Sequence, residues 1–512
     1  MSQLEARPLL SGKITLSEAI DDESDVLRKL SYPEKRLDFY QFLQAHASEI
    51  QTIVSHHLGI PRDSCRTPWI NEWLHGSFNV CIPIYVCGEK RIAIRFPLPY
   101  KIGESTNQGN AEEKLRCEVA TYAWIQAHCP SIPIPRLWGF CFPGESSFTS
   151  LFRAPLLSRL SWYMRWSIRW ILGWPPISSY VVHPHRQKLT SGYIVMDYVE
   201  NWCMLSASWD MVHDDVSKRL TLYRDISRFM LSLAQVQFPR IGSLTMDNYG
   251  VVSLANRPLG LHLHQLENDE ISTEIPRNLT YATTDTYLLD RLSCHDNRIR
   301  YQPNSIFNQS DGESQISTLT IMRALMPHFT QKEGRHGPFI LMLTDLHPSN
   351  IFVDGDGHVT CVIDLEWACT LPVEMLQPPY WLTNRAVDQI TGDSLVDYRE
   401  RHNEFISAFQ AEEEACGSIT SYAEMMRKSW DLGSFWYFNA IESLSGFYNL
   451  FLQHIQPRYG PEAVKGWKDF ERSVTPYWSA GTTRFIERKV HEREQYLQRL
   501  REVFQRASEG NV

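Results

Sequence analysis

The chain has 512 residues, and 43% of them are hydrophobic, which is enough for a packed core and suggests two to four domains. A net charge of −9 and a pI near 6.1 argue against nucleic acid as the main partner. The eleven cysteines form no CxxC pair, which favours reduced thiols in a cytoplasmic protein over a zinc site or a disulfide framework.

Residues 1–70 are predicted to be an N-terminal extension in two parts. Residues 1–25 are polar and acidic and are expected to be disordered, without the long apolar core of a signal peptide. Residues 25–58 carry apolar positions at helical spacing, so a helix is expected there. Nowhere does the sequence keep an apolar run of the length that spanning a bilayer requires.

Residues 71–200 are predicted to form a small lobe of antiparallel strands with one helix. Residues 73–80 and 82–86 read as strands, and a turn at Gly88 leads into a third strand over 91–96. A helix is expected over 111–128. This places Arg95 on the third strand and Glu118 in the middle of the helix.

An insertion over 146–190 interrupts this lobe, and its tryptophans recur every four residues at Trp162, Trp166, Trp170 and Trp174. At about 100° per residue, such a stripe drifts by only about 40° per step, so the four indoles share one helical face. One interpretation is a basic helix over 161–174 that lies on a membrane surface or a partner. The other is a helix that buries its tryptophans on its own domain, which we favour because aromatic stripes are usually core.

Residues 201–480 are predicted to form a larger, mostly helical lobe, followed by a terminal helix and tail over 481–512. A long amphipathic helix is expected over 212–236. Residues 245–315 are polar and expected to be rich in loops. Whether they line an acceptor pocket stays open at this point.

The stretch 339–366 carries the strongest chemical pattern. An apolar run is followed by Asp345 and Asn350, then by two short strands around an Asp-Gly-Asp-Gly turn, and finally by Asp364. In kinases an Asp with this spacing orients a hydroxyl nucleophile, and the Asn and second Asp hold magnesium against the nucleotide phosphates. The alternative is a hairpin whose turn and cap are acidic by chance. The joint pattern is rarer than its parts, so we favour the site.

Two motifs in this stretch support a family resemblance. TDLHPSNIFVD and VIDLEWA resemble the HGDLHPGN…IDWE signature of the aminoglycoside phosphotransferase family, and its fungal members in particular. The family consists of small-molecule phosphotransferases with a protein-kinase-like fold. The resemblance therefore implies a two-lobed α+β fold, with a small antiparallel β lobe and a larger, mostly helical lobe.

The resemblance also implies a role for each candidate site residue. Asp345 would be the catalytic residue that positions the hydroxyl, and Asn350 and Asp364 would be magnesium ligands. The turn over the nucleotide phosphates would consist of Gly76, Ser77, Phe78 and Asn79. Arg95, fixed by Glu118, would bind the phosphates. The hinge beside the nucleotide base would contain Met196 and Tyr198. Two positions depart from the family, because Leu343 stands where a His is usual and Arg95 where a Lys is usual.

The expected function is Mg²⁺-dependent transfer of the γ-phosphoryl group of ATP or GTP to a hydroxyl of a small molecule. The alternative is a pseudokinase, a nucleotide-binding or scaffold protein without turnover, which Leu343 and Arg95 favour. A protein kinase is a weaker interpretation, because Asp364 is followed by Leu365 and Glu366 in place of the DFG triplet.

Overall fold

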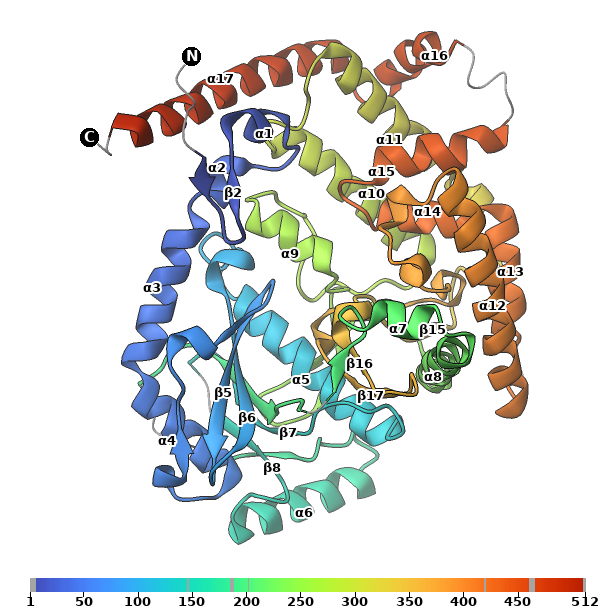
Figure 1. Cartoon of the computed structure of the whole chain (residues 1–512). Coiled ribbons are helices and arrows are strands. Elements are labelled where there is room, and N and C mark those ends of the chain that lie inside the picture. The colour runs from blue at the N-terminus through green and yellow to red at the C-terminus, as the bar shows by residue number, and fades with distance from the viewer. Residues whose placement is uncertain are drawn as a thin grey trace.

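The computed structural model describes residues 6–144, 147–184, 188–200, 202–418, 420–459 and 466–509. The first five residues of the predicted disordered extension, residues 146 and 185–187 of the predicted insertion, and the last three residues of the predicted tail lie outside these ranges. The described chain forms two lobes that meet along a central helix, α5 (Figure 1).

The small lobe is built on an eight-stranded antiparallel sheet whose strand order is β3-β5-β6-β10-β7-β8-β9, with β4 paired to β5. Its strands are β3 (Cys65–Arg66), β4 (Leu74–His75), β5 (Asn79–Val86), β6 (Lys90–Pro97), β7 (Leu137–Cys141), β8 (Ser147–Ser150), β9 (Tyr180–Val182) and β10 (Tyr193–Asp197). The strand predicted around Arg95 is therefore present as β6, and Met196 lies on β10.

Side-chain alternation along the strands gives the sheet two apolar faces. On β6, Ile92 and Ile94 pack against the N-terminal helices α3 (Tyr32–Ala45) and α4 (Ala47–Leu58). Ala93, between them, faces the opposite side with α5 (Asn110–His128). The sheet is therefore enclosed between two helical layers, and α5 is the layer that faces the larger lobe.

The larger lobe holds three small sheets and most of the helices. The sheets are β11 (Cys203–Met204) with β16 (Ile351–Val353) and β17 (Val359–Val362); β12 (Gln237–Phe238) with β15 (Phe339–Leu343) and β18 (Ala368–Pro372); and β13 (Ser243–Met246) with β14 (Val252–Asn256). The main helices are α8 (Val216–Ala234), α10 (Thr284–Tyr301), α11 (Gln309–Phe329), α12 (Asp393–Ala415), α13 (Tyr422–Leu432) and α14 (Ser434–Ile441). The two-lobed α+β fold expected from the sequence is confirmed.

The N-terminal residues contradict the expectation of disorder up to residue 25. Residues 6–25 form β1 (Arg7–Pro8), β2 (Lys13–Ile14) and α1 (Leu16–Asp21), and α2 (Val26–Lys29) follows. Their apolar side chains share a small core with the terminal helix α17 (Thr482–Glu509). The Tyr496 hydroxyl of α17 also accepts a hydrogen bond from the Val26 amide at 2.8 Å. Order at the N-terminus thus comes from a partner about 470 residues away, which a local sequence window does not show.

The segment 245–315 also differs from the expectation of loops. It contains the hairpin strand β14, helix α9 (Leu261–Asn268) and the whole of α10. Arg291 of α10 is buried and donates to Glu442 at 2.8 Å. Polar side chains that pair inside the protein make this segment look like exposed loop in the sequence.

The insertion helix is present as α6 (Leu156–Ile171), between β8 and β9, but the favoured packing of its tryptophans is wrong. Only Trp162 docks, beside Leu151 and Val181. Trp166, Trp170 and Trp174 are 40%, 73% and 56% exposed. The periodicity correctly predicts a helix, but it does not determine whether the aromatic stripe faces protein or solvent.

Candidate active site

The predicted catalytic hairpin is formed by β16 and β17, which pair antiparallel. The carboxylate of Asp354 closes its turn by accepting from the amide of His358 at 2.9 Å. Gly357 has φ 85°, and a Cβ there would come within 2.7 Å of the Lys218 carbonyl oxygen, so the position requires glycine. The local turn chemistry read from the sequence is what forms the hairpin.

The structure brings Asp345, Asn350 and Asp364 together at one end of this hairpin. The Asn350 side-chain amide donates to the backbone carbonyl of Asp345 at 2.9 Å and to its carboxylate at 3.3 Å. The Ile363 amide donates to the Asn350 carbonyl at 2.9 Å, which places Asp364 beside it. Asp364 has φ 62° and ψ 61°, a left-handed conformation that costs energy and often marks functional positions.

Asp345 lies in a largely buried, acidic environment. Burial, and then the neighbouring charges of Asp364 and Glu366, raise the pKa of Asp345 to about 7. The His347 imidazole lies 3.9 Å from the Asp345 carboxylate, and its Nδ1 accepts from the Ser349 amide at 3.3 Å. His347 therefore caps the turn and also lies beside the candidate catalytic carboxylate.

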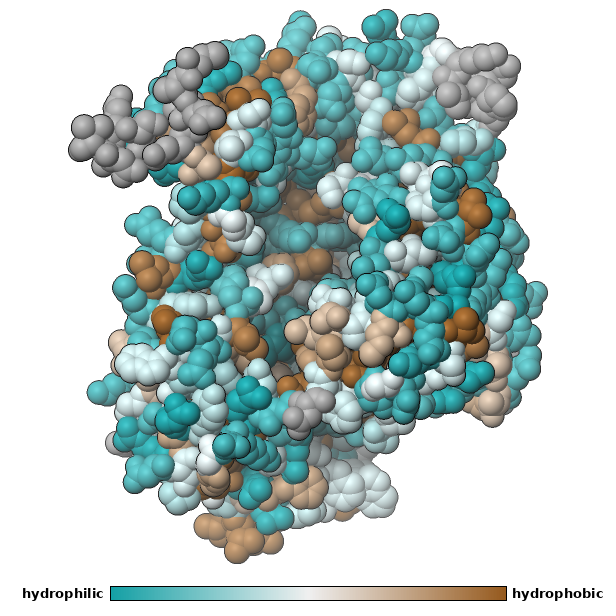
Figure 2. Space-filling view, viewed as in Figure 1, coloured by the Kyte–Doolittle hydropathy of each residue, from teal (hydrophilic) through white to brown (hydrophobic). Residues whose placement is uncertain are grey.

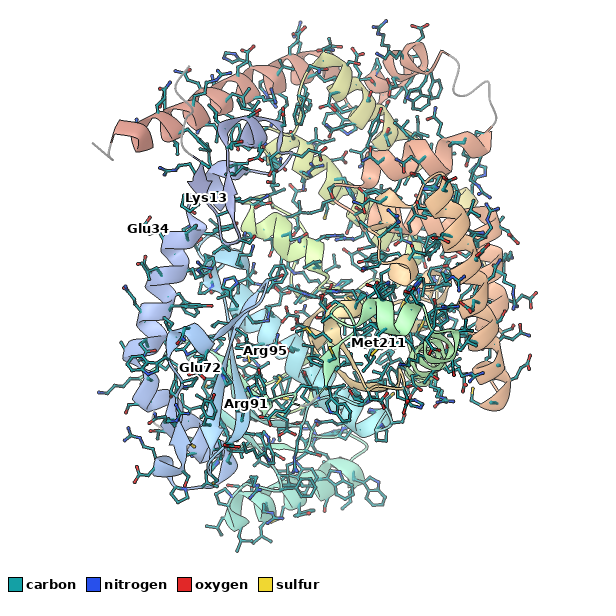
Figure 3. The ribbon with its side chains drawn as sticks, in the orientation of Figure 1. Lys13, Glu34, Glu72, Arg91, Arg95 and Met211 are labelled. Atoms are coloured by element: carbon teal, nitrogen blue, oxygen red, sulfur yellow. The ribbon has the colours of Figure 1, made fainter. Side chains whose placement is uncertain are left out.

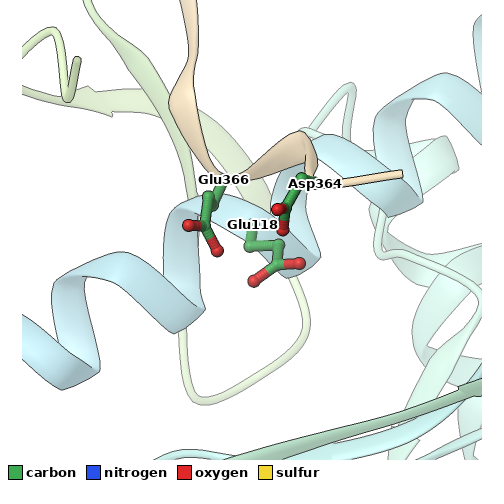
Figure 4. A group of neighbouring side chains, drawn as sticks. All are labelled: Glu118, Asp364 and Glu366. Carbon is green, nitrogen blue, oxygen red and sulfur yellow. The ribbon is translucent and has the colours of Figure 1, made fainter. Parts of the chain in front are cut away.

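Arg95 lies on β6 (Figure 3). It pairs with three neighbouring carboxylates, those of Glu118, Asp364 and Glu366 (Figure 4). Its guanidinium donates to Glu118 at 2.8 Å and to Glu366 at 3.4 Å, and it pairs closely with Asp364. Burial alone would lower the pKa of Arg95, but the charges of Asp364 and Glu118 raise it well above the ordinary value. The predicted Arg95–Glu118 pair is present, and Asp364 is an additional partner that the sequence did not indicate.

The three carboxylates of Glu118, Asp364 and Glu366 offer oxygens that all lie within 4.8 Å of one another. Like charges this close repel unless cations lie among them, and here the cations are the Arg95 guanidinium and the Lys114 ammonium, which pairs with Glu366. The Asn350 amide oxygen and Asp364 Oδ2 are hard oxygen donors of the type that Mg²⁺ takes. The candidate ligands therefore fit a magnesium ion, provided that Asp364 keeps one oxygen for Arg95.

This arrangement predicts a metal response when Arg95 is removed. Arg95→Ala removes the cation that pairs with Glu118 and Asp364, so we expect a lower melting temperature, and a rise on adding Mg²⁺ or Mn²⁺ that exceeds the rise in wild type. Thermal melting with and without the divalent ion measures both effects. Arg95→Lys keeps the charge and is the control. An equal metal response in all three proteins would contradict the cluster.

Lys114 is a functional candidate that the sequence analysis missed. It lies on α5 one turn before Glu118, and its side chain is completely buried. Its ammonium donates to Glu366 at 2.5 Å and to the Asn79 amide oxygen at 2.7 Å. A lysine within a charged helical sequence reads as surface, and only the position of Glu366, 252 residues away, shows its role.

The predicted phosphate-covering turn lies between β4 and β5. The Gly76 amide donates to the Asn79 carbonyl at 2.9 Å, and Gly76 and Ser77 are exposed. Phe78 packs edge-on against Trp367, with ring centroids 5.2 Å apart. Asn79 starts β5, and its side-chain amide donates to Glu366 at 2.7 Å. The turn is thus fixed over the end of the catalytic hairpin.

The predicted hinge leaves the small-lobe sheet at the end of β10. Met196 is buried on this strand beside the Tyr122 hydroxyl. Tyr198 follows it, and the Arg91 guanidinium lies 4.4 Å from its ring centroid. A few residues later β11 pairs with β16 of the catalytic hairpin. The chain therefore crosses from one lobe to the other here, as the hinge assignment requires.

The N-terminal end of α5 is held by a buried ion-pair network from the larger lobe. Arg257 donates with two nitrogens to Glu113, both at 2.8 Å, and to Glu267 at 2.7 Å. These three side chains are at most 5% exposed. Together with Lys114 and Glu118, this network places α5 between the small-lobe sheet and the catalytic hairpin.

Residues 213–374 match the model of a known family, "APH: Phosphotransferase enzyme family". The match includes both strands of the β16–β17 hairpin but covers less than half of the 512-residue chain. No curated protein matches the chain.

Among solved structures, three similar ones are phosphate-transferring enzymes by their descriptions. The macrolide 2'-phosphotransferase MphH from Brachybacterium faecium has 11% identity and a TM-score of 0.35, covering 85% of this chain and 98% of that one. A type I macrolide 2'-phosphotransferase has 9% identity and a TM-score of 0.34, with the same coverage. A glucosamine kinase has 10% identity and a TM-score of 0.27, covering 76% of this chain and 92% of that one.

Proposed function

We propose that this protein transfers the γ-phosphoryl group of a nucleoside triphosphate, ATP or GTP, to a hydroxyl group of a small molecule. The observation that carries the proposal is the joint position of Asp345, Asn350 and Asp364 at one end of the hairpin, with Asn350 bonded to Asp345. The match of residues 213–374 to a phosphotransferase family supports it.

Each residue has a role that follows from its surroundings. Asp345 accepts the proton of the acceptor hydroxyl, or orients it, and the Asn350 amide fixes its carboxylate. Asn350 and Asp364 would hold Mg²⁺, which when bound neutralises charge on the phosphates. Arg95, buried among carboxylates, holds Asp364 and contributes positive charge beside the phosphates. The backbone amides of Ser77 and Phe78 would face the phosphates, while the Gly76 amide closes the turn on the Asn79 carbonyl.

A second function, a nucleotide-binding scaffold without turnover, is favoured by one contact. Arg95 pairs with Asp364, so the carboxylate that would hold the metal is partly neutralised by a guanidinium. Leu343, on β15, offers no polar atom where the resembling family usually has a histidine. Turnover in the presence of an acceptor separates the two functions.

The metal-ligand assignment predicts the effect of replacing Asp364. Asp364→Ala is expected to abolish the part of nucleotide affinity that depends on Mg²⁺, because it removes one of the two proposed metal ligands. Titration calorimetry with ATP and with GTP, with and without Mg²⁺, measures this. Asp356→Asn, at the exposed tip of the same hairpin, is the matched control and should bind as wild type. Unchanged Mg²⁺-dependent binding in Asp364→Ala would refute the assignment.

A further inference from the structure

Helix α6 presents an apolar face to solvent at the foot of the molecule (Figures 1 and 2). None of its residues, all of which the structure describes, is buried. Large apolar side chains at helical spacing are 53–81% exposed: Leu156, Leu157, Leu160, Tyr163, Met164, Ile168, Trp170 and Ile171. Helices of globular proteins usually point such a face toward the core.

The opposite side of α6 holds it to the protein. The Trp162 indole donates to the Ser178 carbonyl at 2.8 Å. Arg165 donates to the Tyr249 carbonyl at 3.1 Å. These two contacts fix the rotation of the helix about its axis, and the bond from Arg169 to the Pro175 carbonyl at 2.6 Å holds the chain just after the helix. The apolar face is therefore turned outward by specific bonds.

The surroundings of this face are basic. The sequence contains no Asp or Glu from residue 147 to residue 196. The Arg136 guanidinium lies over the rings of Trp138 and Phe152, and Arg153 lies over Trp138. Phe152, just before α6, is itself 69% exposed. The acid beside these rings is Asp197, whose carboxylate accepts from the Trp138 indole at 2.8 Å. Exposed aromatic and aliphatic side chains beside several arginines match the apolar and the charged layer of an anionic lipid surface.

We propose that α6 is a docking surface for an anionic lipid bilayer, on which it lies parallel to the membrane plane. No helix of the described residues is long and apolar enough to cross a bilayer, so the contact is with one surface. A second copy of the chain is a poorer occupant, because α6 itself contains no Asp or Glu and a two-fold contact would place its basic side chains against one another.

Vesicle co-sedimentation of the full chain tests the proposal. We expect binding to phosphatidylcholine vesicles that contain phosphatidylserine, weaker binding to pure phosphatidylcholine, and a loss of binding as salt is raised. The tryptophan emission should shift to the blue on binding. Equal binding to both vesicle types, or no binding to either at low salt, overturns the proposal.

Two sets of variants locate the contact. Leu157→Ser and Ile171→Ser are each expected to lower the partition coefficient by about tenfold. Arg153→Gln, just before α6, and Arg159→Gln, within the first turns of α6, should each lower it by about fivefold. Val396→Ser removes an apolar side chain that is 59% exposed on α12 and should bind as wild type. Equal binding by all the variants would place the contact elsewhere and overturn the proposal.

Light scattering after size-exclusion chromatography tests the alternative occupant. A concentration-dependent dimer that Ile171→Ser abolishes, together with no vesicle binding, would replace the lipid surface with a second copy. The exposed positions of these variants should leave the fold intact, and circular dichroism checks this. Vesicle binding is measured without nucleotide, so its outcome is independent of the proposed phosphoryl transfer.

Discussion

Asp345→Asn is expected to lower phosphoryl transfer by about 10²–10⁴-fold, the range for a positioned acid or base, while nucleotide affinity stays nearly unchanged. Asparagine has almost the same shape and can still accept from Asn350, but it cannot take a proton from the acceptor. The measurement compares turnover, with a screened acceptor or with water, against affinity from calorimetry.

The same experiment separates the enzyme from the scaffold. If wild type binds Mg²⁺ and nucleotide but shows no turnover with any acceptor or with water, the scaffold function gains support. If Asp345→Asn turns over as fast as wild type, Asp345 is not the positioned base. The loss of nucleotide binding in this variant would instead show that Asp345 acts on the nucleotide side of the site.

Lys114→Met is expected to destabilise the protein by about 3 kcal/mol, because removing one partner of a buried ion pair leaves the other charge uncompensated. Breaking a buried ion pair by removing one partner costs about 3–5 kcal/mol. Glu366 is only 1% exposed but would keep Asn79 and Arg95 as partners, so we expect a loss at the lower end of this range. Urea unfolding measures the change. Mg²⁺-dependent nucleotide affinity should also fall, since Glu366 holds Arg95 and the Gly76–Phe78 turn.

A double variant separates charge from packing. Lys114→Met/Glu366→Gln removes both charges and should recover part of the lost stability. Lys90→Met removes an exposed lysine from β6 and is the matched control, expected to unfold as wild type. If Lys114→Met unfolds at the wild-type urea concentration, the buried pair is not formed in solution.

The sequence predicted those parts of the candidate site whose residues lie close together in the chain. Asp345 and Asn350 are five residues apart, and the turn after Asp354 fixes the hairpin that brings Asp364 to them. The Arg95–Glu118 pair is what the family resemblance implies, and the structure contains it. Lys114 and the Arg95–Asp364 contact join segments more than 250 residues apart, and no local pattern encodes them.

The errors in the fold have the same origin. Residues 6–25 are ordered by α17, and α10 is polar because residues such as Arg291 pair inside the larger lobe. For α6, spacing determines which side chains share a face, whereas bonds such as Trp162 to Ser178 determine where that face points. Sequence periodicity contains the first kind of information but not the second.

The attachment of α5 at two points has a consequence for how substrates enter. Separation of the lobes would break both the Glu113–Arg257 pair and the Lys114–Glu366 pair, each buried and each costing about 3–5 kcal/mol to disrupt. A wide hinge opening is therefore a rare event, and hydrogen exchange of the α5 amides reports how often it occurs. A substrate would therefore meet two lobes whose spacing stays nearly constant, with Gly76 and Ser77 as the exposed part of the turn between β4 and β5.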